Sequence, residues 1–145
     1  MVHQKAGKSA MNQATIALID DDPVFLELIE RMLRRRGHRV VTALNGQEGL
    51  ELCLRELPAL VITGIIMPVM RGWELCRRLR QNGALQHVPI LVMSGCAAPD
   101  QVAAHYAAGA NAFLPKPFSQ LAFSAIVTQL LGETESPRSS EPLRT

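Results

Sequence analysis

Short apolar runs alternate with helical patterns along most of this chain, and the alternation restricts the folds open to it. Apolar runs of strand length cover about residues 16–19, 39–44, 60–63, 88–93 and 112–115. Between and after these runs, apolar residues recur at the three- and four-residue spacing of a helix. Strands that alternate with helices favour a parallel sheet, because each crossover places a helix on a face of the sheet. The pattern therefore predicts an α/β fold, a three-layer α/β/α sandwich with five parallel strands.

The first predicted helix shows the clearest local signals. Asp22 can cap it, and Pro23 then stands at the first helical position. Two acidic residues each precede a basic residue by four positions: Glu27 precedes Arg31, and Glu30 precedes Arg34. Such charge pairs are typical of the solvent-exposed face of a helix. The core-facing stripe is predicted to consist of Phe25, Leu28, Ile29 and Met32. In the helix after Gly72, we expect Leu75 and Leu79 to face inward and Arg77, Arg78 and Arg80 to face solvent.

Composition indicates one domain with polar ends. Hydrophobic residues make up 48% of the chain, yet no run approaches the length of a membrane span. Residues 1–13 are predicted to be a flexible tail and residues 133–145 a disordered tail, which leaves 14–132 as the domain. Three cysteines without C-x-x-C spacing fit a reducing cytoplasm. The four histidines lack metal-ligand spacing and most are predicted to lie at the surface: His3, His38, His87 and His105.

Polar and turn residues follow the predicted strands, where a parallel sheet binds its ligands. In chain order, these are the acidic pair Asp20–Asp21, Gly64 before x-x-Met-Pro, Ser94, and the dipeptide Lys116–Pro117. Adjacent carboxylates at a strand end suit Mg²⁺, which prefers oxygen ligands. The basic run 34–36 could suggest nucleic-acid binding, but no helix-turn-helix motif accompanies it and the net charge is only +2. Neither a nucleic acid nor a membrane is therefore an expected partner.

This order of motifs resembles the receiver domain of two-component response regulators, over residues 14–132. The resemblance implies a flavodoxin-like fold with strand order 2-1-3-4-5 and a cis bond before Pro117. It implies that Asp20, Asp21 and the backbone carbonyl of Ile66 hold Mg²⁺. It also implies that Ser94 hydrogen-bonds the phosphoryl group, that Lys116 neutralises its charge, and that Phe113 stands at the switch aromatic position.

One departure from that family bears directly on chemistry. The residue before x-x-Met-Pro is the aspartate that accepts the phosphoryl group in the family, and here it is Gly64. Glycine offers neither a nucleophile nor a metal ligand, so we expect weak or absent Mg²⁺ binding and no required cofactor. Thr63 is a poor substitute, because neighbouring strand residues face opposite sides of a sheet. Lys116 is then expected to pair with Asp20 or Asp21.

Three further positions depart from the family. Arg71 stands where family members often carry aspartate, and Phe113 stands where they often carry tyrosine. Gly95 stands where alanine is common in the family, and glycine leaves more room above the pocket. Phe113 lacks the hydroxyl that could contact Ser94. None of these changes restores a nucleophile at the strand ends.

The sequence therefore predicts a stand-alone, atypical receiver in phosphorelay signalling that acts through protein–protein interaction and is not an enzyme. The resemblance implies a partner surface over Pro99–Leu131, for a histidine kinase, a phosphotransfer protein, a downstream effector or a second copy in a homodimer. Two alternatives stay open at this point. One is a switch controlled by a ligand or by modification, and the other is a normal receiver that carries an engineered acceptor substitution.

Overall fold

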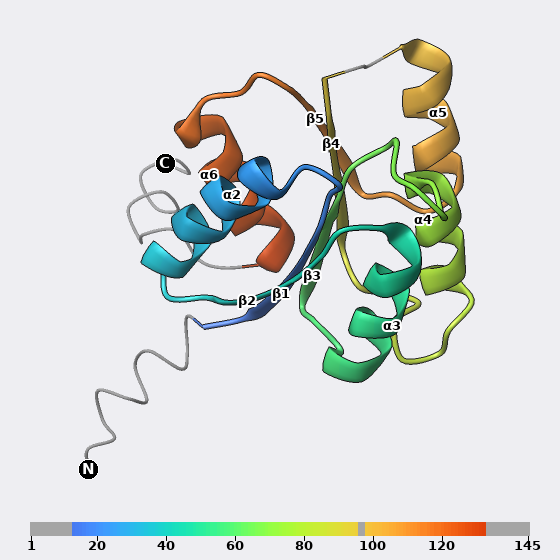
Figure 1. Ribbon diagram of the computed structural model, residues 1–145, viewed down its shortest axis with the longest axis horizontal. Helices are drawn as coiled ribbons and strands as arrows, with labels where there is room; N and C mark the ends of the chain where they lie inside the picture. The colour runs from blue at the N-terminus through green and yellow to red at the C-terminus, as the bar shows by residue number, and fades with distance from the viewer. Residues whose placement is uncertain (1–12, 96–97, 133–145) are drawn as a thin grey trace, which may run out of the picture.

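The computed structural model describes residues 13–95 and 98–132, so the two predicted tails, except Gln13, and Cys96 lie outside the described residues. Strands and helices alternate strictly along the chain, as the sequence predicts (Figure 1). The strands are β1 (Thr15–Ile19), β2 (Arg39–Ala43), β3 (Leu60–Thr63), β4 (Ile90–Ser94) and β5 (Ala112–Pro115). The helices are α2 (Pro23–Arg35), α3 (Gly46–Glu56), α4 (Gly72–Arg80), α5 (Pro99–Ala107) and α6 (Gln120–Leu131).

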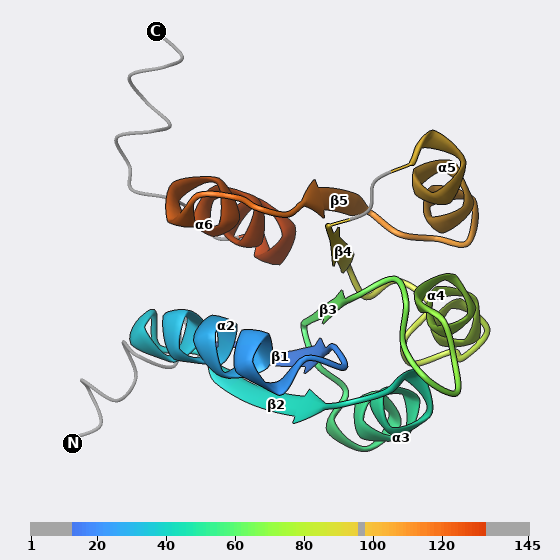
Figure 2. The same ribbon diagram turned by 45° about the horizontal axis from the view of Figure 1, so that its top comes forward.

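The five strands form one parallel sheet in the order β2-β1-β3-β4-β5, which confirms the predicted topology. Helices α2 and α6 cover one face of the sheet, and α3, α4 and α5 cover the other (Figure 2). Each face carries its own apolar cluster, one built around Leu75 and Leu79 and the other around Phe123 and Val127. No helix in the described part of the chain is long and apolar enough to cross a membrane.

Helix α2 begins as predicted but turns a different stripe to the core. The Asp22 carboxylate accepts hydrogen bonds from the backbone N–H groups of Val24 and Phe25, and Pro23 opens the helix. The buried residues are Leu26, Ile29 and Leu33. Of the predicted stripe, only Ile29 is fully buried, while Leu28 keeps 54% of its surface exposed. The prediction was wrong because two apolar stripes overlap on this helix, and Leu26 and Leu33 belong to the one that meets the sheet.

Both charge pairs predicted on α2 are present. Arg31 lies 3.3 Å from the Glu27 carboxylate, and Arg34 lies 2.8 Å from the Glu30 carboxylate. They are exposed, so each contributes only a few tenths of a kcal/mol to helix stability. Strand β4 begins two residues later than predicted. The Val88 N–H bonds back to the Leu85 carbonyl in a turn, and Pro89 has no N–H to donate.

Arg80 corrects the prediction that all three arginines of α4 face solvent. Its guanidinium donates to the Gly109 carbonyl at 2.8 and 3.2 Å, to the Leu85 carbonyl at 3.2 Å and to Asn111 Oδ1 at 2.9 Å. Burial lowers the pKa of Arg80. The side chain thus ties the end of α4 to the turns before β4 and β5. Leu75 and Leu79 face inward, as predicted.

Replacing Arg80 with methionine is expected to lower the free energy of unfolding by about 2 kcal/mol, because partly buried acceptors lose their donor while the aliphatic stem is kept. Chemical denaturation measures the change. The matched control is Arg78→Met on the exposed side of α4, which should stay within about 0.5 kcal/mol of the parent. Equal losses in the two variants would contradict a specific role for Arg80.

Two of the three described histidines are buried, so the prediction that most histidines lie at the surface is wrong. His38 is 4% exposed, and its Nδ1 accepts a hydrogen bond from the Ala14 N–H at 3.2 Å. His105 is fully buried on α5, and its Nδ1 donates to the Gln101 carbonyl at 2.7 Å. Within the described residues, His105 Nε2 has no hydrogen-bond partner. Alanines surround His105 in the sequence, so the spacing there does not reveal which side faces the core.

Candidate functional site

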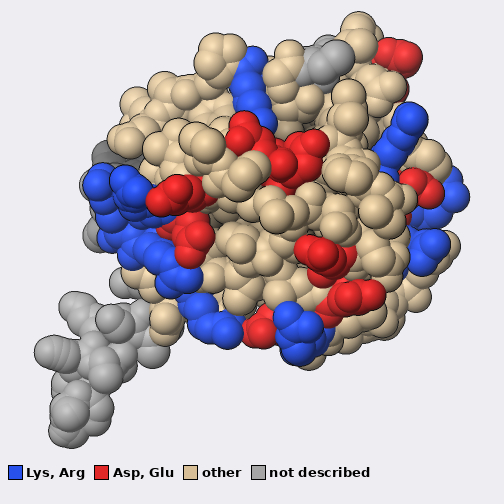
Figure 3. Space-filling view, in the orientation of Figure 1, with Lys and Arg blue, Asp and Glu red and all other residues tan. Residues whose placement is uncertain are grey.

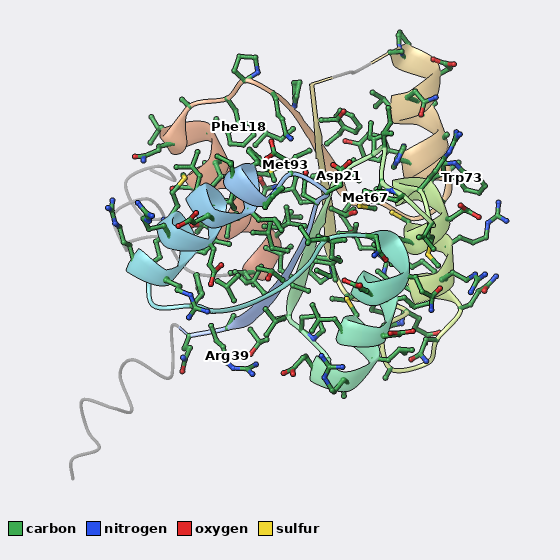
Figure 4. All side chains as sticks on the ribbon, in the orientation of Figure 1. Asp21, Arg39, Met67, Trp73, Met93 and Phe118 are labelled. Carbon is green, nitrogen blue, oxygen red and sulfur yellow. The ribbon has the colours of Figure 1, made fainter. Side chains whose placement is uncertain are left out.

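The fold brings the predicted polar residues to one edge of the sheet. Asp20 directly follows β1, Gly64 follows β3, Ser94 ends β4 and Lys116 follows β5. Backbone hydrogen bonds join these strand ends in pairs: Gly64 N–H donates to Ile19 C=O at 3.0 Å, and Lys116 N–H donates to Ser94 C=O at 2.8 Å. Asp21 follows Asp20 directly at this same edge of the sheet (Figure 4).

Asp20 and Lys116 form the central ion pair of this edge. The Lys116 ammonium lies 3.5 Å from Asp20 Oδ2, which agrees with the expected pairing of Lys116 with one member of the acidic pair. The Asp20 residue is only 5% exposed, and its Oδ1 accepts the Asp22 N–H at 3.0 Å. Burial raises the pKa of the Asp20 carboxyl, while the Asp22 hydrogen bond and the Lys116 charge oppose the rise.

Gly64 leaves a space that Asp20 partly fills. A Cβ atom at residue 64 would lie 2.9 Å from Asp20 Oδ2 and 3.5 Å from its Cγ. Gly64 is buried, and Thr63 before it is fully buried with its hydroxyl donating to the Gly64 carbonyl at 3.1 Å. The Thr63 hydroxyl is therefore engaged within the fold. Among the described residues, nothing lies within 4 Å of a Cβ built on Gly95, which agrees with the room expected there.

The remaining predicted positions surround this edge of the sheet. Ser94 is half-buried, and Arg71 is exposed at the start of α4, where its backbone N–H donates to Glu74 at 3.2 Å. Phe113 is half-buried on β5 and meets His105 edge-on, with the ring centroids 6.3 Å apart. The bond between Lys116 and Pro117 is cis, as the resemblance implies.

The donor set fits a magnesium ion poorly. Among the residues that the structure describes, no group of three His, Cys, Asp or Glu side chains is placed to hold a metal. The available ligands are the Asp20 and Asp21 carboxylates and backbone carbonyls, and Asp20 is already paired with Lys116. Asp21 is exposed, and Ile66, in the loop after β3, is 71% exposed. Because Mg²⁺ gives up its hydration water reluctantly, it gains little from so few ligands.

Asp20→Asn is expected to raise the thermal midpoint near neutral pH. The folded state holds a proton on Asp20 more tightly than the unfolded state does, so ionisation of Asp20 costs stability. This cost is present at neutral pH and disappears as the pH falls through the raised pKa towards the ordinary range. The gain over the parent should therefore shrink in acid, in thermal scans from pH 7 to pH 4. The matched control Asp21→Asn, at an exposed carboxylate, should change little at either pH.

The chain matches the response regulator receiver domain family over residues 16–128. It is 32% identical over 128 residues to the transcriptional regulatory protein AfsQ1 of Streptomyces coelicolor, covering 87% of this chain and 56% of that protein. It is 34% identical over 126 residues to the response regulator MprA of Mycobacterium leprae, with 87% and 54% covered. The chain thus spans about half the length of these two relatives.

Solved structures support the same assignment. A response regulator from Chloroflexus aurantiacus has a TM-score of 0.79 at 31% identity, covering 83% of this chain and 99% of that chain. The receiver domain of the sensor histidine kinase PA1611 from Pseudomonas aeruginosa, with a magnesium ion in its active-site cleft, has a TM-score of 0.78 at 27% identity, with 83% and 99% covered. This chain belongs to the receiver domain family of two-component response regulators.

Proposed function

We propose that this receiver domain works through protein–protein contacts and does not accept a phosphoryl group at residue 64. The observation that carries the proposal is the missing side chain at the carboxyl end of β3, beside the Asp20–Lys116 pair. By its place before x-x-Met-Pro, Gly64 occupies the position of the acceptor aspartate of the family. Aspartyl phosphate cannot form without a carboxylate, so the usual control of the family is lost at this position.

The ion pair between Lys116 and Asp20 supports the same proposal. In the absence of an acceptor carboxylate, Lys116 neutralises Asp20, and the Asp20 carboxylate occupies part of the space left at residue 64. Mg²⁺ binding would have to compete with Lys116 for Asp20. We therefore propose that any magnesium binding is weak and that Asp20, Asp21, Ser94 and Lys116 are remnants of a phosphate pocket.

The partner surface that we propose runs from Pro99 to Leu131, through α5, β5 and α6. Two large side chains on it are exposed, with Tyr106 47% and Leu121 79% accessible. A histidine kinase, a phosphotransfer protein, a downstream effector or a second copy would use this surface. Action as a stand-alone domain stays a prediction, as does the pathway that the domain serves.

Beryllofluoride with Mg²⁺ tests whether the acceptor is the main part that this pocket lacks. In Gly64→Asp, we expect amide shifts at Ser94 and Lys116 in two-dimensional NMR spectra, because beryllofluoride binds a carboxylate as a phosphoryl mimic. The parent and the matched control Gly64→Asn should show none. A response in the parent would overturn the proposal. No response in Gly64→Asp would show that the pocket has diverged beyond residue 64 and would remove the support for Ser94 and Lys116 as its remnants.

A further inference from the structure

An apolar groove lies between α2 and α6, on the face of the sheet opposite α3, α4 and α5. Its larger part holds about 380 Å³ and adjoins a smaller part of about 170 Å³, and the two share Met32 and Gln120. We call the two parts together the α2–α6 groove. Its lining residues are Phe25, Leu28, Ile29, Met32, Lys116, Pro117, Phe118 and Gln120, continued by Arg35, Arg36 and Ser124.

The groove has an apolar end and a basic end. At the apolar end, the Phe25 and Phe118 rings meet edge-on with centroids 6.3 Å apart, and Leu28 is 54% exposed. These residues include most of the stripe on α2 that the sheet does not cover. At the other end lie Arg35 and Arg36. Basic side chains gather over the C-terminal half of α2 (Figure 3). An occupant should therefore combine acidic residues with a short apolar segment.

The chain itself continues from the basic end of this groove. The Arg36 guanidinium donates to Thr128 Oγ1 at 2.6 Å, which fixes the end of α2 beside the last turn of α6. Helix α6 stops at Gly132, whose φ of 71° turns the chain out of the helix. Figures 1 and 2 both place α2 and α6 side by side. The described part of the chain therefore ends close to the Arg36 end of α2.

The sequence after Gly132 has the composition that this groove requires. Glu133 and Glu135 come first, and Glu141 with Pro142–Leu143 follows after a further five residues. The groove runs along α6, whose 12 residues span about 18 Å. An extended chain advances about 3.3 Å per residue, so residues 133–143 can cross that length with slack. By length alone, the acidic residues can reach the arginines and the apolar pair can reach the aromatic end.

We propose that residues 133–145 of this chain occupy the α2–α6 groove. Glu133 and Glu135 pair with the arginine end, and Pro142–Leu143 lie between Leu28 and the aromatic rings beside Lys116. Lys116 lines the groove and also holds Asp20, with its ammonium 3.7 Å from the centre of the Phe25 ring. Occupation of the groove therefore contacts the same lysine that closes the strand-end site. The segment would compete with any protein partner for this face.

Methyl and amide NMR spectra of the full chain test this proposal. The test variant combines Glu133→Gln, Glu135→Gln and Leu143→Ser. The control combines Ser139→Lys and Ser140→Lys, which changes the net charge by the same amount. We expect the methyl signals of Leu28 and Met32 to shift in the test variant and to stay in place in the control. The Trp73 indole signal should stay constant in both, since Trp73 projects from α4 on the other side of the sheet (Figure 4).

Two outcomes would overturn the proposal. Unchanged Leu28 and Met32 signals in the test variant would show that the segment does not reach the groove. Shifts that disappear when the protein is diluted would show that a second copy, rather than the same chain, fills the groove. In support, 0.5 M NaCl should move the parent signals part of the way towards those of the test variant, because salt screens the pairing of glutamate with arginine.

Discussion

Gly64→Asp is expected to lower the free energy of unfolding by about 1–3 kcal/mol in metal-free buffer. The new Cβ would lie 2.9 Å from Asp20 Oδ2, so the Asp20 side chain must move away. A second carboxylate then shares a buried site with Asp20, and one lysine cannot neutralise both. Saturating Mg²⁺ should recover much of the loss, because it binds the folded state and contributes about 2.7 kcal/mol at a concentration of 100 times Kd.

The parent and Gly64→Asn serve as references for this prediction. Asparagine has nearly the same size as aspartate but carries no charge, so it should lose less stability and gain little from Mg²⁺. Urea denaturation of all three proteins, with EDTA or with Mg²⁺, separates the steric effect from the electrostatic one. Equal Mg²⁺ stabilisation of the parent and Gly64→Asp would contradict the role given to residue 64.

Gly72→Ala is expected to be strongly destabilising, with a loss of about 3 kcal/mol or more. A Cβ on Gly72 would overlap the Gly64 carbonyl oxygen, and it would lie 3.0 Å from His105 Nε2 and 3.2 Å from Ile65 Cα. Two of these neighbours are backbone atoms, which no side-chain rotation can move aside. The N–H of Gly72 also donates to the Ile65 carbonyl at 2.9 Å, so the loop after β3 would shift as a unit.

Gly83→Ala is the matched control for Gly72→Ala, because no described residue comes within 4 Å of a Cβ at that position. Thermal and urea unfolding should place this control within about 0.5 kcal/mol of the parent. Removal of the imidazole in the double variant Gly72→Ala/His105→Ala should not restore stability, because the overlap with the Gly64 carbonyl remains. Rescue by the double variant would show that His105, rather than the backbone, limits the space.

The order and type of the elements were predictable because their signals are local. Asp22 caps α2 and Ser119 caps α6 through bonds to nearby N–H groups. The alternation of strands with helices leaves few arrangements other than a parallel sheet. The strand order came from the resemblance, because periodicity does not say which strands are neighbours. The convergence of Asp20, Gly64, Ser94 and Lys116 follows from that order.

The residues whose burial was predicted wrongly owe their positions to contacts between segments far apart in the sequence. Arg80 looks like a solvated helix residue until the turns at Leu85 and Gly109 bring carbonyls to its guanidinium. His105 lies among alanines, so only the packing of α5 against Gly72 and Phe113 shows that it is buried. On α2, both stripes are apolar, and the position of the sheet decides which of them is covered.

The most direct test of the account is intact-mass spectrometry of the unmodified chain after incubation with acetyl phosphate and Mg²⁺. Gly64 offers no carboxylate, so we predict that the mass of the parent stays unchanged while Gly64→Asp gains one phosphoryl group that hydroxylamine removes. A hydroxylamine-sensitive phosphoryl group on the parent would contradict the central claim, because it would show that a carboxylate elsewhere in this receiver domain accepts the phosphoryl group.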